Sequence, residues 1–90
     1  QFIGDGERRL AELRDVSSCN DQRAFLKIVH ALKGSAATVG VDSITKMCVE
    51  AEQRSEDLDR STMANYVVRL SRVFQGACAE LQLYLERTRH

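Results

Sequence analysis

The chain has 90 residues, a length that suits one small domain with a single core. Its 13 basic and 13 acidic residues give a formal net charge of zero, which argues against a nucleic-acid binder that neutralises phosphates. No apolar run approaches the roughly 20 residues of a membrane span, no signal-peptide pattern opens the chain, and proline is absent. We expect one helical domain over residues 1–90 that contacts neither nucleic acid nor membrane.

Apolar periodicity predicts four helices, separated by polar and glycine-containing turns. They cover about residues 5–17, 20–39, 42–57 and 61–88. Residues 1–4 are expected to be a frayed end or residues foreign to the natural chain. The connections are short, one of them only Gly40 and Val41, so successive helices must be antiparallel neighbours. The predicted fold is an all-α, antiparallel (up-down-up-down) four-helix bundle.

The predicted helix ends carry residue types that commonly terminate helices. Asn20 or Asp21 is suited to cap the second helix, Asp42 the third and Ser61 the fourth. Gly40 is expected to end the second helix, because glycine readily adopts the left-handed conformation that follows a last helical turn.

The last predicted helix has the most regular apolar pattern. Its apolar residues alternate at spacings of four and three, as in the seam of a helical bundle: Met63, Val67, Leu70, Phe74, Ala77, Leu81 and Tyr84. At 1.5 Å per residue this helix is about 40 Å long, against about 30 Å for the second helix. Its end therefore overhangs the bundle, bends near Gly76, or packs against the first helix or a second chain. The sequence favours a monomer and leaves a dimer open.

One histidine lies on the water-facing side of the second predicted helix. At 100° per residue the apolar residues fall within an arc of about 60°: Phe25, Val29, Leu32 and Ala36. His30 lies roughly 130° from the centre of that arc and Gly34 roughly 170°, with Lys33 and Ala37 beside them. Glycine inside a helix costs about 1 kcal/mol relative to alanine, so Gly34 indicates that another molecule approaches the backbone there. Imidazole, ammonium group and bare backbone together predict a docking site for a phosphoryl donor or acceptor.

The residues from His30 to Ala36, His-Ala-Leu-Lys-Gly-Ser-Ala, followed by Gly40, resemble the signature of histidine-containing phosphotransfer (HPt) domains of two-component phosphorelays. The likeness continues through Ile44, Cys48 and Glu52. It implies a phosphocarrier and not an enzyme with an ATP site. His30 would accept a phosphoryl group from a receiver-domain aspartate and pass it to another receiver domain. The resemblance implies no cofactor or metal in the chain itself, with Mg²⁺ held by the partner receiver.

Spacing places Glu52 beside His30. The two residues lie ten or eleven positions to either side of the turn at 40–41, and so at the same level of antiparallel helices. HPt domains often have Glu or Gln at this spacing, and the resemblance implies that Glu52 orients the imidazole so that Nε2 accepts the phosphoryl group. Lys33 is expected to stabilise the phosphoryl oxygens.

The expected docking surface comprises Gly34, Ser35, Ala37, Arg23 and Lys27. Arg23 and Lys27 lie on the same side of the helix as His30 and give a basic approach surface for an acidic receiver pocket. Ser35 has three possible roles, which are bonding the preceding helical turn, lining the rim of the site, or packing closely as a small residue. His90 has no evident role.

Two other functions stay open. A helical interaction module, or an HPt fold that has lost phosphotransfer, would present the same surface without exchanging phosphate. A helix-turn-helix DNA binder is the weaker alternative, because Glu50 and Glu52 stand where a recognition helix would carry cations.

The cysteines indicate a reducing compartment. Cys19, Cys48 and Cys78 are odd in number and lack metal-ligand spacing, so we expect reduced thiols and a cytoplasmic location. The resemblance suggests the carboxy-terminal module of a bacterial hybrid sensor histidine kinase, which would tether the domain to the inner membrane.

Overall fold

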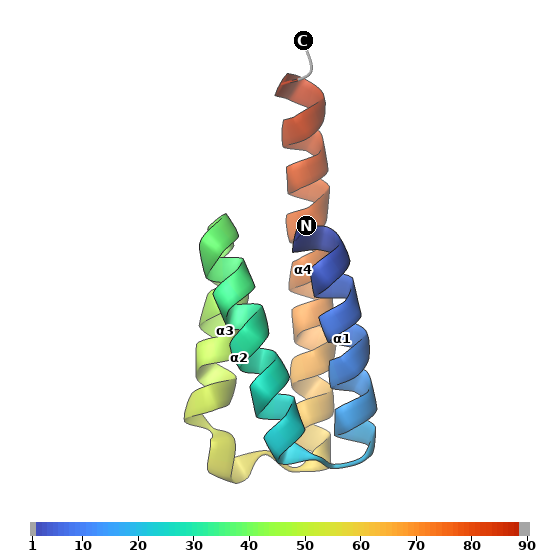
Figure 1. The fold of residues 1–90 in the computed structure, drawn as a ribbon, viewed down its shortest axis with the longest axis vertical. Coiled ribbons are helices and arrows are strands. Elements are labelled where there is room, and N and C mark those ends of the chain that lie inside the picture. The colour runs from blue at the N-terminus through green and yellow to red at the C-terminus, as the bar shows by residue number, and fades with distance from the viewer. Residues whose placement is uncertain (1, 89–90) are drawn as a thin grey trace.

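A computed structural model describes residues 2–88 and has four α-helices that run alternately in opposite directions (Figure 1). These are α1 (Phe2–Ser18), α2 (Gln22–Val39), α3 (Asp42–Gln53) and α4 (Arg60–Thr88), with a short 3₁₀ helix, η1 (Ser55–Asp57), before α4. Each helix packs against its neighbours in chain order, and α4 closes the bundle against α1. The predicted all-α, up-down-up-down bundle is confirmed. Gln1 and His90 lie outside the described residues.

Two helices have boundaries that the sequence prediction placed wrongly. α1 begins at Phe2, so residues 2–4 are helical and not frayed. Asp5 secures this first turn, because its carboxylate pairs with Arg8 at 2.6 Å and with Arg9 at 2.9 Å. α3 ends at Gln53 and the predicted last turn is 3₁₀ instead, because the chain turns there to bring the side chain of Leu58 into the core.

Both predicted ends of α2 are confirmed. The Asp21 carboxylate accepts a hydrogen bond from the backbone N–H of Ala24 at 3.1 Å and so caps the amino-terminal end, while Asn20 stays outside the helix. Gly40 has a φ of 85°, and its N–H donates to the carbonyl of Ala36 at 2.9 Å. Left-handed geometry at Gly40 makes the reversal into α3 possible within two residues.

The other two predicted caps are wrong. α3 is preceded by Val41, which makes no side-chain capping bond, and Asp42 is already its first helical residue. α4 is capped by Asp59 instead of Ser61. The Asp59 carboxylate accepts a hydrogen bond from the backbone N–H of Thr62 at 2.7 Å. Asp59 is the capping residue because α4 begins at Arg60, one residue earlier than predicted.

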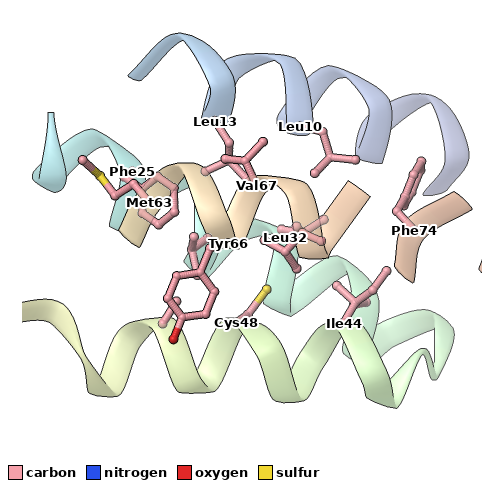
Figure 2. Packing of buried hydrophobic residues seen from close by; sticks show 14 of the residues in the cluster. Leu10, Leu13, Phe25, Leu32, Ile44, Cys48, Met63, Tyr66, Val67 and Phe74 are labelled. Carbon is pink, nitrogen blue, oxygen red and sulfur yellow. The ribbon is translucent and has the colours of Figure 1, made fainter. Parts of the chain in front are cut away.

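All four α-helices contribute to one continuous core (Figure 2). The predicted apolar stripe of α2 is confirmed, since each of its four residues is at most 1% exposed. Cys48 of α3 is buried in the same core, and burial, reinforced by the nearby charge of Glu52, raises the pKa of its thiol to about 12. Tyr66 of α4 is buried without having been predicted. Its hydroxyl donates to Glu50 at 3.2 Å, which lets a phenol occupy the core edge.

The carboxy-terminal end of α4 overhangs the bundle, which is one of the alternatives that the sequence left open. Figure 1 shows α4 continuing past the ends of the other helices. Met63, Val67, Leu70 and Phe74 are buried as their spacing predicts, whereas Tyr84 is 64% exposed although it continues the same spacing. At the level of Tyr84, no other helix within the described part of the chain lies beside α4 to cover its apolar side. Within residues 2–88, no helix combines the length and apolar character needed to cross a membrane.

Gly6 permits close packing between α1 and α4. A Cβ atom on Gly6 would overlap the ring of Phe74, whereas one on Gly4 would meet no atom within 4 Å. We expect Gly6→Leu to be less stable than Gly4→Leu by about 1–3 kcal/mol, the usual cost of overpacking, because only the first must displace the ring. Urea unfolding of the two variants measures this difference, and equal stabilities would contradict the packing argument.

Candidate functional site

The imidazole of His30 projects into solvent from the middle of α2. The core stripe of this helix occupies its opposite face, and the side chain of His30 is 71% exposed. Arg23, Leu26, Lys27 and Glu52 line a shallow depression with it. The exposed position predicted from the helical periodicity is confirmed.

Glu52 of α3 holds one nitrogen of that ring. The distance from Nδ1 of His30 to Oε2 of Glu52 is 3.0 Å, so the predicted proximity across the antiparallel helices is confirmed. An ionised carboxylate only accepts hydrogen bonds, which assigns the ring hydrogen to Nδ1. Nε2 then carries the lone pair, and a neutral imidazole of this tautomer is a nucleophile at Nε2.

Lys33 binds the same carboxylate from the other side. Its Nζ donates to Oε1 of Glu52 at 2.6 Å, and the side chains of both residues are 28% exposed. The hydrogen bond from Lys33, assisted by the one from His30, lowers the pKa of Glu52 below its ordinary value of 4.5. Glu52 is therefore ionised at neutral pH, as its role as acceptor for His30 requires.

This geometry predicts a contribution to stability that depends on pH. A carboxyl group with a lowered pKa stabilises the fold above its unfolded value, near 4.5, and this contribution is lost as the pH falls through the folded value. We expect wild type to exceed Glu52→Gln in stability by about 1 kcal/mol or less at pH 7, because the pair is partly exposed. The difference should shrink below about pH 4.5, as measured by denaturant unfolding across pH. A difference that is constant from pH 7 to pH 3 would contradict the assignment.

Bare backbone lies next to His30 on the exposed side of α2. Gly34 is exposed one turn after His30, and Ala37 follows on the same strip. A Cβ atom on Gly34 would meet nothing within 4 Å, so no contact inside the chain explains a glycine at this position. The surface here is low enough for another protein to approach the helix closely.

Arg23 and Lys27 extend the strip toward the amino-terminal end of α2. Both are exposed and line the depression around His30, where the sequence pattern predicts them. Leu26, half-buried in the same depression, was missed by the sequence reasoning. It lies one turn before His30, and this spacing is the signal that would have found it.

Ser35, which the sequence analysis assigned to the docking surface, lies on a different side of α2 from His30. Its hydroxyl donates to Oδ2 of Asp5 in α1 at 3.3 Å, and the side chain is half-buried. At 100° per residue Ser35 is about 140° around the helix from His30. Within the chain it therefore joins α1 to α2, and the hydrogen bond goes to α1 and not to the preceding turn of α2.

Among residues 2–88, no three histidine, cysteine or carboxylate side chains gather as metal ligands would.

Comparison with known proteins identifies the family of the chain. No curated protein and no solved structure matches the chain significantly. A family model described as Hpt domain matches residues 1–90, the whole chain. An exposed, carboxylate-bound histidine in a four-helix bundle accords with that match, and the chain belongs to the Hpt domain family, the histidine phosphotransfer modules of phosphorelay signalling.

Proposed function

We propose that His30 is the phosphoacceptor of a phosphorelay intermediate, which takes a phosphoryl group from a receiver-domain aspartate and passes it to another receiver domain. The observation that carries this proposal is the exposed imidazole whose Nδ1 is bound to Glu52 at 3.0 Å. Of the two histidines in the chain, His30 is the one that the sequence resemblance identifies as the phosphoacceptor.

The transfer step uses the free ring nitrogen. The lone pair of Nε2 attacks the phosphorus atom of the aspartyl phosphate, an N–P bond forms, and the P–O bond to the aspartate breaks. The electron pair of that bond stays on the receiver carboxylate. A ring that carries a phosphoryl group on Nε2 and a hydrogen on Nδ1 is positively charged, and the Glu52 carboxylate stabilises it. Attack by the aspartate of a second receiver reverses the step.

Lys33 acts on this step in two ways. Its ammonium group has three N–H donors, and one of them holds Glu52 at 2.6 Å. Another N–H can contact the phosphoryl oxygens, which supports the stabilising role expected for this residue. Phosphoryl transfer depends mainly on positioning and charge neutralisation, and Mg²⁺ in the receiver supplies the remaining positive charge. The chain itself is a phosphocarrier without an ATP site.

The docking surface for the receiver is the exposed strip of α2. Gly34 and Ala37 provide a low surface beside His30, and Arg23 and Lys27 give it positive charge. Receiver domains gather aspartates around their own phosphorylation site, so basic side chains raise the rate of encounter. The setting we propose is cytoplasmic, within a bacterial hybrid sensor kinase that holds the domain near the inner membrane.

Direct phosphorylation of the chain tests the proposal. The chain is incubated with phosphorylated receiver domains and the label is examined for stability. A phosphohistidine on His30 should be acid-labile and alkali-stable, and fresh receiver should then remove it. A helical interaction module or a fold that has lost phosphotransfer would bind receivers without acquiring label. Binding to DNA that weakens with salt would favour the helix-turn-helix alternative.

A further inference from the structure

Exposed apolar side chains gather at one end of the molecule. Of the six large apolar side chains that are exposed among residues 3–88, four lie there: Val39 at the end of α2, and Leu83, Tyr84 and Leu85 on the overhang of α4. Tyr84 and Leu85 are 64% and 57% exposed. The overhang extends past the ends of the other helices (Figure 1). Exposed apolar side chains that share one side of such an overhang indicate a contact with another molecule.

The apolar residues of the overhang form a stripe on one side of the helix. Leu81 lies at its centre, Tyr84 about 60° to one side and Leu85 about 40° to the other. Leu83 lies about 160° away, on the opposite side. Beside the stripe is an open groove between α4 and the α2–α3 turn. Its apolar lining residues include Val39, Val41, Val73, Ala77, Leu81 and Tyr84, and Asp42, Ser43 and Glu80 line it as well.

Charges along the stripe indicate what covers it. Glu80 and Arg87 both lie on the edge of the stripe next to Tyr84, seven residues apart, and the described residues offer neither of them an ion pair. Seven residues span about 10 Å of helix, so the two charges do not neutralise each other within one chain. A second helix that runs antiparallel would bring its own Arg87 next to Glu80.

We propose that the overhang of α4 pairs with the same segment of a second copy of this chain, antiparallel and related by a two-fold axis near residues 82 and 83. In this arrangement Leu81 of each copy lies opposite Tyr84 of the other. Glu80 lies within about two residues, or 3 Å along the axis, of Arg87 of the second copy. The symmetry forms this ion pair twice.

The groove beside α4 fits this pairing. With the axis near residues 82 and 83, Thr88 of the second copy lies beside Ala77, where the groove next to the α2–α3 turn receives it. The two overlapping segments, residues 77–88 of each copy, bury less surface than a standard interface, so the dimer is a weak one that depends on concentration. His30 lies nine residues, or about 14 Å, from the end of α2 and stays exposed in the pair.

Sedimentation equilibrium of the 90-residue chain over a range of concentrations tests the proposal. Wild type should show a reversible equilibrium between monomer and dimer. Leu85→Asp should raise the dissociation constant at least tenfold, whereas Leu83→Asp, equally exposed on the opposite side, should leave it unchanged. Circular dichroism confirms that both variants are folded. A wild type that is monomeric at every concentration, or equal weakening by both variants, would overturn the proposal.

Exchange of the charges tests the antiparallel orientation. Glu80→Arg and Arg87→Glu should each weaken the dimer, because each places like charges together across the axis. The double variant should restore the wild-type dissociation constant, since it forms the same two ion pairs with their charges exchanged. Failure of the double variant to recover would overturn the antiparallel pairing even if a dimer forms.

Discussion

Replacing His30 with glutamine is expected to abolish phosphoryl acceptance while the fold stays intact. The side chain is 71% exposed, so the change in the free energy of unfolding should stay within about 0.5 kcal/mol. The glutamine amide can still donate a hydrogen bond to Glu52, but it offers no nucleophilic nitrogen. Incubation with labelled receiver, followed by quantification of acid-labile label, measures the loss.

The control for this variant is Lys27→Gln. Lys27 is exposed in the same depression, and its loss removes a charge from the docking surface while the imidazole remains. We expect slower phosphorylation that reaches the same final level. Acid-labile label on His30→Gln, or unfolding of that variant, would show that the phosphoacceptor is another residue or that His30 has a structural role.

Replacing Gly34 is expected to affect stability and phosphotransfer in opposite directions. Gly34→Ala should raise the free energy of unfolding by up to about 1 kcal/mol, because alanine is the better helix former and its Cβ meets no atom of the chain. The methyl group of the new alanine occupies the space through which the receiver must approach, and the longer side chain of Gly34→Gln obstructs that space more. We expect transfer to slow in Gly34→Ala and to be blocked in Gly34→Gln, with His30 still in place.

Gly76→Ala is the matched control, because Gly76 is also exposed inside a helix and a Cβ atom there meets nothing within 4 Å. This variant should gain similar stability and transfer phosphate at the wild-type rate. Stability is measured by urea unfolding and transfer by the initial rate of labelling. Normal transfer through Gly34→Gln would contradict the proposal that a partner approaches the backbone at Gly34.

The sequence determined the features that depend on local spacing. The helical period alone separates the core stripe of α2 from the exposed strip that carries His30, because both follow from 100° per residue. Gly40 fixes the short reversal into α3, and the equal count of residues on each side then brings Glu52 to His30. When so short a turn joins two antiparallel helices, residues equally far from the turn lie at the same level.

Contacts between distant segments were decided only by the tertiary structure. Ser35 has the same motif position whether it faces a partner or α1, and only the packing of α1 directs its hydroxyl to Asp5. Lys33 is similarly a free cation in the sequence, whereas the structure binds it to Glu52. The regular spacing of α4 continues to Tyr84, but burial ends where the other helices end. A pattern records which side of a helix is apolar, and only the neighbouring helices decide how far along its length that side is covered.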